Sequence, residues 1–132
     1  MSTDIEIEKE IIAKGLIAPR ITPDDIENAI YSEHFFTAFD GRQGAIDNGT
    51  YVGNERPENI NRDLAFLKTK TFCILQLKNG FTVTGESDCA SPENFNAEIG
   101  RKIARDNAKQ KIWALEGYLL KQKLYTSKEN EN

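Results

Sequence analysis

The clearest alternation of apolar and polar residues lies in the middle of the chain, where two β-rich runs, 71–78 and 81–87, flank Asn79-Gly80. An Asn-Gly pair between such runs is typical of a two-residue hairpin turn, because both central positions need a positive φ. This turn predicts that Lys78 faces Phe81. The predicted faces carry Phe72, Ile74, Gln76, Phe81 and Val83 on one side, and Cys73, Leu75, Leu77, Thr82 and Thr84 on the other.

Two helices are predicted before the hairpin. Residues 1–20 have apolar positions at helical spacing, and although 5–7 is also compatible with the start of a strand, we favour a helix that ends near Gly15. The segment 22–25 (Thr-Pro-Asp-Asp) supplies an N-cap hydroxyl, a proline for the first helical position and two carboxylates for the first turn. A second helix is therefore expected over 23–33.

The segment 40–59 is expected to be a loop, because four glycines and a proline fall within it. Residues 51–52 are compatible with a short strand, and 58–67 with one or two helical turns. A loop of this length inside a small domain is usually functional or mobile, so the segment is also a candidate lid over a ligand.

A further helix-start signal follows the hairpin, where Ser91 is a candidate N-cap and Pro92 a first helical residue. We expect a helix over 92–111 and a second helical stretch to about 125, with a kink near Trp113 or Gly117. The predicted inward-facing positions of the first stretch are Phe95, Ile99 and Ile103. The polar residues 126–132 are expected to be a disordered tail.

These elements predict one α+β domain over residues 1–125. Its antiparallel sheet is built around the Asn-Gly hairpin, with an N-terminal helix and C-terminal helices packed on it. A chain of 132 residues has no room for a second core. A hairpin alone is marginally stable, so these helices, further strands or another subunit must cover it.

Charge and composition exclude several classes of function. The net charge of −4 argues against a duplex-DNA binder, which needs an extended basic surface. Residues 92–125 are nonetheless net basic, which suffices for a small anionic ligand. No apolar run is long enough to span a membrane, and the acidic start does not resemble a secretory signal. Two cysteines suit a reducing cytoplasm.

The most suggestive charged pattern lies on the predicted C-terminal helix. Asn94, Glu98, Arg101 and Arg105 share one stripe, and two arginines one turn apart can bind two phosphates of one ligand. The alternative is a solvated helix face on which Glu98 pairs with Arg101 or with Lys102.

Other candidate residues carry weaker signals. Phe81 follows the turn and is either a stacking platform for a purine or an ordinary core residue. His34 is the one histidine, and a hydrogen-bonded histidine at a helix end is the favoured interpretation. Cys89 has no neighbouring base to activate it. No metal-binding, phosphate-loop or nucleophile motif is recognisable, so we expect no metal, no cofactor and no enzymatic activity.

Several segments carry a more specific resemblance. These are residues 79–87, 89–95, 97–105 and 111–121, together with 32–38 and 40–41. Over most of 22–124 the chain resembles a family of small proteins from tailed bacteriophages and prophages. This family is similar to that of the first type of Thoeris anti-defence protein, which acts as a sponge for a signalling nucleotide.

The resemblance implies a function in the host cytoplasm. Such proteins bind cyclic ADP-ribose isomers, the signals made by bacterial TIR-domain defence enzymes, and hold them uncleaved, so that the NAD-depleting effector stays inactive. Some members are also implied to bind cyclic di- or trinucleotides in separate pockets. Members assemble as dimers or hexamers with the signal pocket at a subunit interface, so a homo-oligomer is expected here.

The resemblance also implies roles for individual residues. Phe81 corresponds to a phenylalanine that stacks on the ligand, and Arg101 and Arg105 to a pair that contacts phosphates. Asn94, or alternatively Asn96, corresponds to an asparagine that contacts the base or ribose. Apart from the resemblance, a small phage regulatory or adaptor protein that binds a host protein stays open, as does a nucleotide-processing enzyme.

Overall fold

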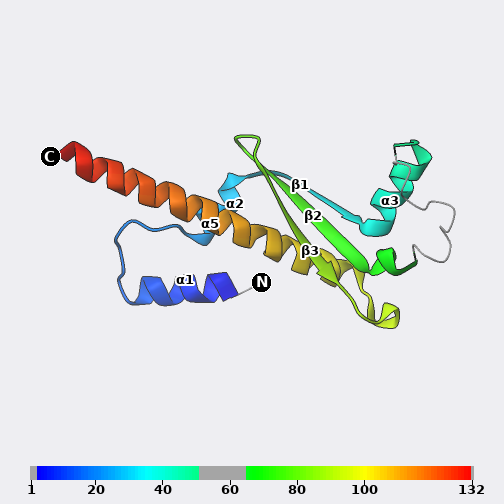
Figure 1. The fold of residues 1–132 in the computed structure, drawn as a ribbon. Coiled ribbons are helices and arrows are strands. Elements are labelled where there is room, and N and C mark those ends of the chain that lie inside the picture. Colours follow the sequence, from blue (N-terminus) through cyan, green and yellow to red (C-terminus); the bar gives the residue numbers. More distant parts are fainter. Residues whose placement is uncertain (1–2, 51–64, 132) are drawn as a thin grey trace.

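The computed structural model describes residues 3–50 and 65–131 and has an α+β fold (Figure 1). A three-stranded antiparallel sheet carries an N-terminal helix and a long C-terminal helix, as the sequence predicts. The elements in chain order are α1 (Thr3–Ala13), α2 (Pro23–Ala29), β1 (Ile30–Thr37), α3 (Ala38–Asp47), the 3₁₀ helix η2 (Ala65–Thr69), β2 (Lys70–Leu77), β3 (Thr82–Asp88), the 3₁₀ helix η3 (Pro92–Asn94) and α5 (Ala97–Glu131).

The hairpin of β2 and β3 forms, but its register is shifted by one residue from the prediction. Gln76 pairs with Thr82 instead of Val83, and Leu77 N–H donates to the carbonyl of Phe81 at 2.7 Å. Gly80 alone in this loop has a positive φ, of 90°, which is the geometry of a three-residue loop ending in a bulge. The shift turns Val83 onto the face of Cys73, Leu75 and Leu77, where it is buried.

Strand β1 was not predicted, because a helix was expected to extend over 23–33 and α2 is shorter than this. The helix ends at Ala29 rather than Glu33, and β1 begins at Ile30 as the edge strand that pairs with β2. Phe35 lies opposite Cys73 and faces α5, whereas Phe36 lies opposite Phe72 on the outer face. The aromatic and β-branched residues of this segment favour a strand once β2 offers a partner.

Helix α3 replaces the first part of the predicted loop. The Thr37 side chain accepts from the Asp40 N–H at 3.1 Å and Asp40 accepts in return from the Thr37 N–H, a reciprocal cap that starts the helix despite its glycines. The structure confirms a helical turn over 65–69. The strand predicted at 51–52 and the rest of 58–67 lie outside the described residues.

The two predicted C-terminal stretches are one continuous helix. Helix α5 starts at Ala97, not at 92, because the Asn96 side chain accepts from the Ile99 N–H at 3.0 Å and caps it. The Ser91 side chain makes no cap hydrogen bond and precedes only η3. The helix passes 113–117 within one α-helical element and continues to Glu131, so residues 126–131 are helical and the disordered tail was a wrong prediction.

The helix packs on the sheet through small residues. The buried positions of its first half are Gly100, Ala104, Ala108 and Ile112. They contact the face of Cys73, Leu75, Leu77 and Val83. The predicted inward stripe was wrong, because Ile99 is 56% and Ile103 is 44% exposed. The backbones of β3 and α5 lie close together at Gly85, so only small residues fit on the part of the helix that faces it. This steric limit outweighs the extra apolar area that larger residues would bury.

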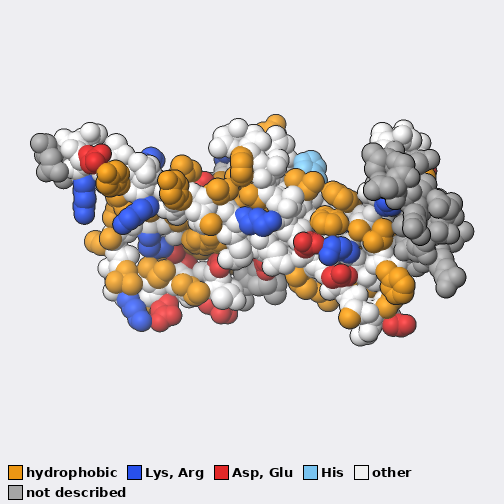
Figure 2. Space-filling view, in the orientation of Figure 1, with side chains coloured by type: hydrophobic (Ala, Val, Ile, Leu, Met, Phe, Trp, Pro, Cys, Tyr) orange, Lys and Arg blue, Asp and Glu red, His pale blue; other side chains and the backbone are white. Residues whose placement is uncertain are grey.

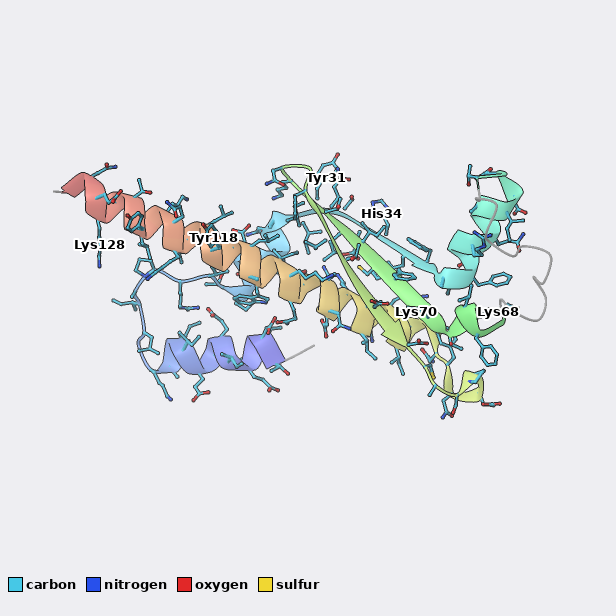
Figure 3. The ribbon with its side chains drawn as sticks, viewed as in Figure 1. Tyr31, His34, Lys68, Lys70, Tyr118 and Lys128 are labelled. Carbon is cyan, nitrogen blue, oxygen red and sulfur yellow. The ribbon has the colours of Figure 1, made fainter. Side chains whose placement is uncertain are left out.

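The molecule is elongated, because α5 runs past the end of the sheet (Figure 1). A helix of 35 residues is about 52 Å long, whereas an eight-residue strand spans about 26 Å. The sheet and α3 lie towards the N-terminal end of α5, and α1 lies beside its middle part. Tyr118 and Lys128 lie on the projecting part, whereas Lys68 and Lys70 mark the other end (Figure 3).

Candidate functional site

The start of α5 and the end of β1 enclose a hollow of about 130 Å³, here called the Arg101 hollow. Its lining combines aromatic rings, a guanidinium, a carboxylate and two hydroxyls. These residues are Phe35, Phe36, Thr37, Asp40, Thr71, Phe95, Ala97 and Arg101. The Phe36 ring stacks on Phe72 at 5.7 Å between centroids, so this wall is held in place from the outer face of the sheet.

Two polar groups of the hollow have no partner in the described part of the chain. Arg101 makes no ion pair or hydrogen bond there, although Glu98 is one turn away and pairs instead with Lys102 at 3.3 Å. Thr71 is only 3% exposed, and its hydroxyl has no hydrogen-bond partner. A buried hydroxyl without a partner is costly, so this atom is a candidate ligand contact.

Arg105 is engaged within the chain. Its guanidinium donates to Glu27 at 2.9 Å and to Glu33 at 2.8 Å, and Lys109 lies 3.5 Å from Glu27. The hydrogen bond from Arg105 lowers the pKa of Glu27, and the same bond raises the pKa of Arg105. Arg105 therefore ties α2 and β1 to α5 and is not an open phosphate contact in this arrangement.

Phe81 lies at the other end of the sheet. It is 55% exposed and, with Lys111, Leu115 and neighbouring β3 residues, lines a separate open hollow of about 390 Å³. Lys111 donates to the Thr84 hydroxyl at 3.4 Å. Ten residues separate Arg101 from Lys111 along α5, which is about 15 Å of helix. One chain therefore does not bring Phe81 and Arg101 around one small ligand.

The two candidate asparagines differ in their local roles. Asn94 is exposed in η3, where its backbone N–H donates to Ser91 O at 2.9 Å. The Asn96 side chain is used to cap α5. Asn94 therefore keeps its side chain available, whereas Asn96 has a structural role.

The histidine and the cysteines have ordinary environments. His34 lies on β1 rather than at a helix end and shares a 3.0 Å hydrogen bond with the Ser32 hydroxyl (Figure 3). Cys73 is buried in the core, and burial raises the pKa of its thiol to about 11. Cys89 is half-buried, and its thiol donates to Ser91 O at 3.2 Å. Cys73 thus behaves as a small apolar residue.

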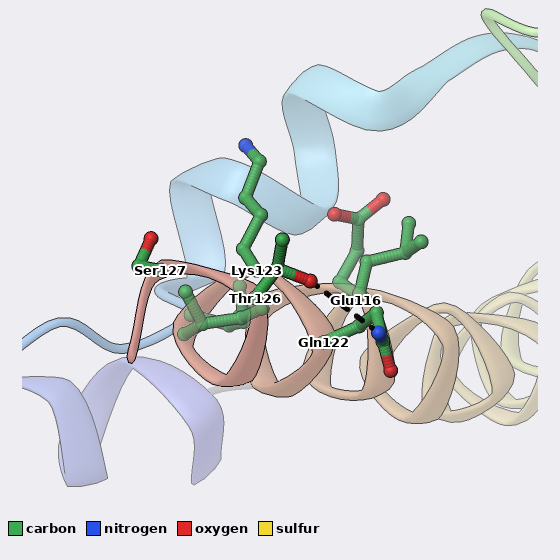
Figure 4. Close-up of a pocket in the computed structure, with 8 residues that line it drawn as sticks. Glu116, Gln122, Lys123, Thr126 and Ser127 are labelled. Carbon is green, nitrogen blue, oxygen red and sulfur yellow. Dashed lines mark hydrogen bonds between the residues drawn. The ribbon is translucent and has the colours of Figure 1, made fainter. Parts of the chain in front are cut away.

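The projecting half of α5 carries a second kind of surface. A hollow of about 520 Å³ is lined by Ile21, Glu116, Leu119, Leu120, Gln122, Lys123, Thr126 and Ser127 (Figure 4). Seven of these eight residues come from α5, so nearly the whole lining is one helix face. Large exposed apolar side chains continue along the helix, namely Tyr118, Leu119, Leu124 and Tyr125. Figure 2 shows hydrophobic side chains gathered over this part and over neighbouring α1.

Residues 3–50 and 65–131 contain neither a candidate metal-binding cluster nor a helix that could span a membrane. No group of three or more histidine, cysteine or acidic side chains within these ranges has the arrangement of a metal site. No helix in the same ranges combines the length and the apolar character needed to cross a membrane.

Comparison with known proteins places the chain among phage proteins. Residues 21–124 match the model of the Phage protein (N4 Gp49/phage Sf6 gene 66) family. The chain belongs to this family. The matched residues include the described strands, α2, α3 and most of α5, but not α1. Neither the curated proteins nor the solved structures contain a significant match.

Sequence reasoning missed Thr71, Asp40 and Lys111 as members of the two hollows. A signal existed for Thr71, because it is the one polar residue among the inward positions of the strand, the others being Cys73, Leu75 and Leu77. Asp40 was overlooked because its segment was predicted to be a loop. Lys111 was overlooked because it was placed at the predicted end of a helix.

Proposed function

We propose that this phage protein sequesters cyclic ADP-ribose-type immune signals without cleaving them and thereby blocks activation of a Thoeris effector. The observation that carries the proposal is the Arg101 guanidinium, which has no partner in the described chain and stands over a hollow with aromatic walls. An always-charged, planar donor beside aromatic rings suits a phosphate that adjoins a sugar or base.

The size of the Arg101 hollow supports a shared pocket. A volume of about 130 Å³ is too small for a whole cyclic ADP-ribose, so the hollow would hold one part of the ligand while the remainder extends out of it. Phe81 and Asn94 of a second copy would supply stacking and polar contacts to the rest. Phe81 lies beside Lys111, and about 15 Å of helix separates Lys111 from Arg101, so a pocket between subunits would let Phe81 and Arg101 contact a single ligand.

The energetic requirement is modest. A charge-assisted hydrogen bond contributes about 1.5–3 kcal/mol and a stacked base about 1–3 kcal/mol. A few such contacts in a preformed pocket approach the 12 kcal/mol or so of nanomolar binding. Retention of the signal needs no chemical step, so the proposal assigns no catalytic residue.

Isothermal titration with cyclic ADP-ribose isomers tests the proposal. We expect tight binding by the unaltered chain, loss of at least tenfold in affinity for Arg101→Ala, and no loss for Lys121→Ala, which changes an exposed cation on the projecting half of α5. Denaturation of the complex should release the ligand intact. Absence of binding, or recovery of a cleaved product, would refute the sponge function.

The same surface features favour a homo-oligomer. The exposed apolar side chains of α5 and α1 are more than a soluble monomer usually leaves together, and a second copy would cover them. Light scattering should give a mass of a dimer or hexamer, and Leu119→Asp with Leu124→Asp should reduce it. A monomeric mass for the unaltered chain would contradict the shared pocket.

A second candidate function rests on the same projecting helix. A small phage adaptor that binds a host protein would also need an exposed apolar face of this kind. Its distinguishing result is a stoichiometric complex with a host protein by a chain that does not bind any cyclic nucleotide.

A further inference from the structure

The Arg101 hollow contains more chemistry than a phosphate contact requires. Besides Arg101, its lining includes Asp40 and Thr71, and the Thr71 hydroxyl is buried and has no hydrogen-bond partner. A carboxylate repels a bare anion but accepts hydrogen bonds from hydroxyl groups. The combination therefore suits a ligand in which a phosphate and free hydroxyls lie on one small ring.

We propose that the Arg101 hollow is a ribose-phosphate subsite in which Thr71 and Asp40 bind the sugar and Arg101 binds the phosphate. This inference rests on the proposed function, because it names which part of the signal enters this hollow. It adds Thr71, Asp40 and the Phe36–Phe95 wall to the binding residues, and it assigns Arg105 a positioning role.

The start of α5 strengthens the phosphate end of the subsite. Ala97, the first residue of this helix, lines the hollow, and the Asn96 cap satisfies the N–H of Ile99. The first backbone N–H groups of a helix lack partners within it, and together with the helix dipole they favour an anion. Arg101, one turn further along α5, adds a full charge on the same side.

Thr71 is the independent sign that a ligand belongs here. Its hydroxyl is buried against the backbone of Gly100, where any added Cβ would lie 2.9 Å away. Ser87 is nearby but donates to Gly100 O at 2.8 Å and does not pair with Thr71. A valine has the same shape without the hydroxyl, so a purely structural position would favour valine in this strand.

Asp40 has room for this role. One of its oxygens accepts a long 3.4 Å hydrogen bond from the Thr37 N–H at the start of α3, and Asp40 is exposed and lines the hollow. The rings of Phe36 and Phe95 provide an apolar wall for the carbon face of a sugar. A sugar with a phosphate therefore matches the hollow better than phosphate alone.

Titration of the full chain with ribose 5-phosphate and with inorganic phosphate tests the subsite. We expect ribose 5-phosphate to bind more tightly, and Thr71→Val to weaken its binding about fivefold, as the loss of one hydrogen bond implies. Asp40→Asn should reduce the difference in affinity between ribose 5-phosphate and inorganic phosphate. Equal binding of both probes to the unaltered chain, or unchanged binding by Thr71→Val, would overturn the subsite.

Stability measurements separate binding from folding. Thr71→Val should unfold at the same or a higher denaturant concentration, because it removes a buried hydroxyl without a partner. Thr69→Val is the matched control, since the buried Thr69 hydroxyl donates to Phe66 O at 3.1 Å. That variant should lose stability and keep its affinity for ribose 5-phosphate. Loss of stability in Thr71→Val with unaltered affinity would make Thr71 purely structural.

The two proposals fail in different ways. If cyclic ADP-ribose isomers do not bind while ribose 5-phosphate binds in a Thr71-dependent manner, the sponge function is refuted and the subsite stands. If the cyclic isomers bind the unaltered chain and Thr71→Val equally well, the subsite is refuted and the sponge function stands.

Discussion

The two halves of α5 solve different packing problems. In 97–112 the helix lies against the sheet, and its buried positions are glycine and alanine until Ile112. Trp113 and Leu115 still pack against the core, but further along α5 the large apolar side chains, such as Tyr118 and Tyr125, are 71% and 54% exposed. Small residues serve close contact within one chain, whereas large residues on the projecting half suit contact with another surface.

This contrast explains where a ligand site can form. The first half is held rigidly, because Gly85 lets the helix backbone approach β3, and Arg105 ties α2 and β1 to it. Arg101 therefore projects from a fixed base beside the sheet. Among the described residues, the second half beyond Leu115 is flanked by α1 and the region of α2 (Figure 1). Most of its surface therefore remains available for assembly.

Closing the space at Gly85 should have the largest effect. A Cβ there would lie 2.2 Å from Ala104 O and 2.3 Å from Ala108 N. Gly85→Val should therefore separate helix from sheet and lower the free energy of unfolding by about 3 kcal/mol or more. Urea denaturation followed by circular dichroism measures this. A loss under about 1 kcal/mol would mean that the contact is not tight.

Truncation of one apolar residue in each half should come next. Ile112 is completely buried, so Ile112→Ala should cost about 2–4 kcal/mol. Leu119 is 54% exposed, so Leu119→Ala should cost under about 0.5 kcal/mol in the dissociated chain. Denaturation at low protein concentration compares the two variants. Equal losses would show that the projecting half is also part of the core of one chain.

Removal of the Arg105 charge should have a smaller and pH-dependent effect. Arg105→Gln should cost about 1–2 kcal/mol near neutral pH, because both partner carboxylates are partly exposed and screened. The pKa of Glu27 is lowered from 4.5 in the folded chain, so its contribution is present above about pH 4.5 and is lost as the pH falls through the folded value.

The unaltered chain should therefore lose stability between pH 5 and pH 3 more steeply than Arg105→Gln, by the linkage between ionisation and folding. Lys121→Gln, on the projecting half, serves as the control and should follow the unaltered chain. If the free energy of unfolding falls with pH in the same way in all three proteins, the positioning role assigned to Arg105 is wrong.

The smallest effect should be a gain. Gly117 lies inside the projecting half, and a Cβ there would meet nothing within 4 Å. Gly117→Ala should stabilise the chain by about 0.5–1 kcal/mol, since glycine is unfavourable inside a helix. Thermal unfolding measures this gain. If Gly117→Ala lowers the thermal stability only at protein concentrations where the chains associate, Gly117 lies in an interface between chains.

Local signals in the sequence predicted the elements but not their pairing. The Asn-Gly turn located the hairpin, but its register depended on whether both turn residues take a positive φ, and in the structure Gly80 does and Asn79 does not. Segment 30–37 has no strand signal strong enough to compete with the preceding helix start. It becomes a strand because β2 offers an unpaired edge.

The inward face of α5 was predicted wrongly for a related reason. Periodicity identifies the largest apolar residues, and it selected Ile99 and Ile103. The closeness of the two backbones depends on Gly85, which is remote in sequence, so the preference for alanine could not be read from the helix alone. For the site, the sequence identified Arg101 as a candidate, but the hollow around it comes from segments more than sixty residues apart.

Helix α1 is joined to the remainder by few contacts. None of its residues is buried, and its connections include an ion pair between Glu8 and Arg20 and a 3.0 Å hydrogen bond from Trp113 to Asp4. It also precedes the residues that define the family. Because no residue of α1 is buried and the matched range begins at residue 21, substitutions in this segment should disturb the sheet and the first half of α5 very little.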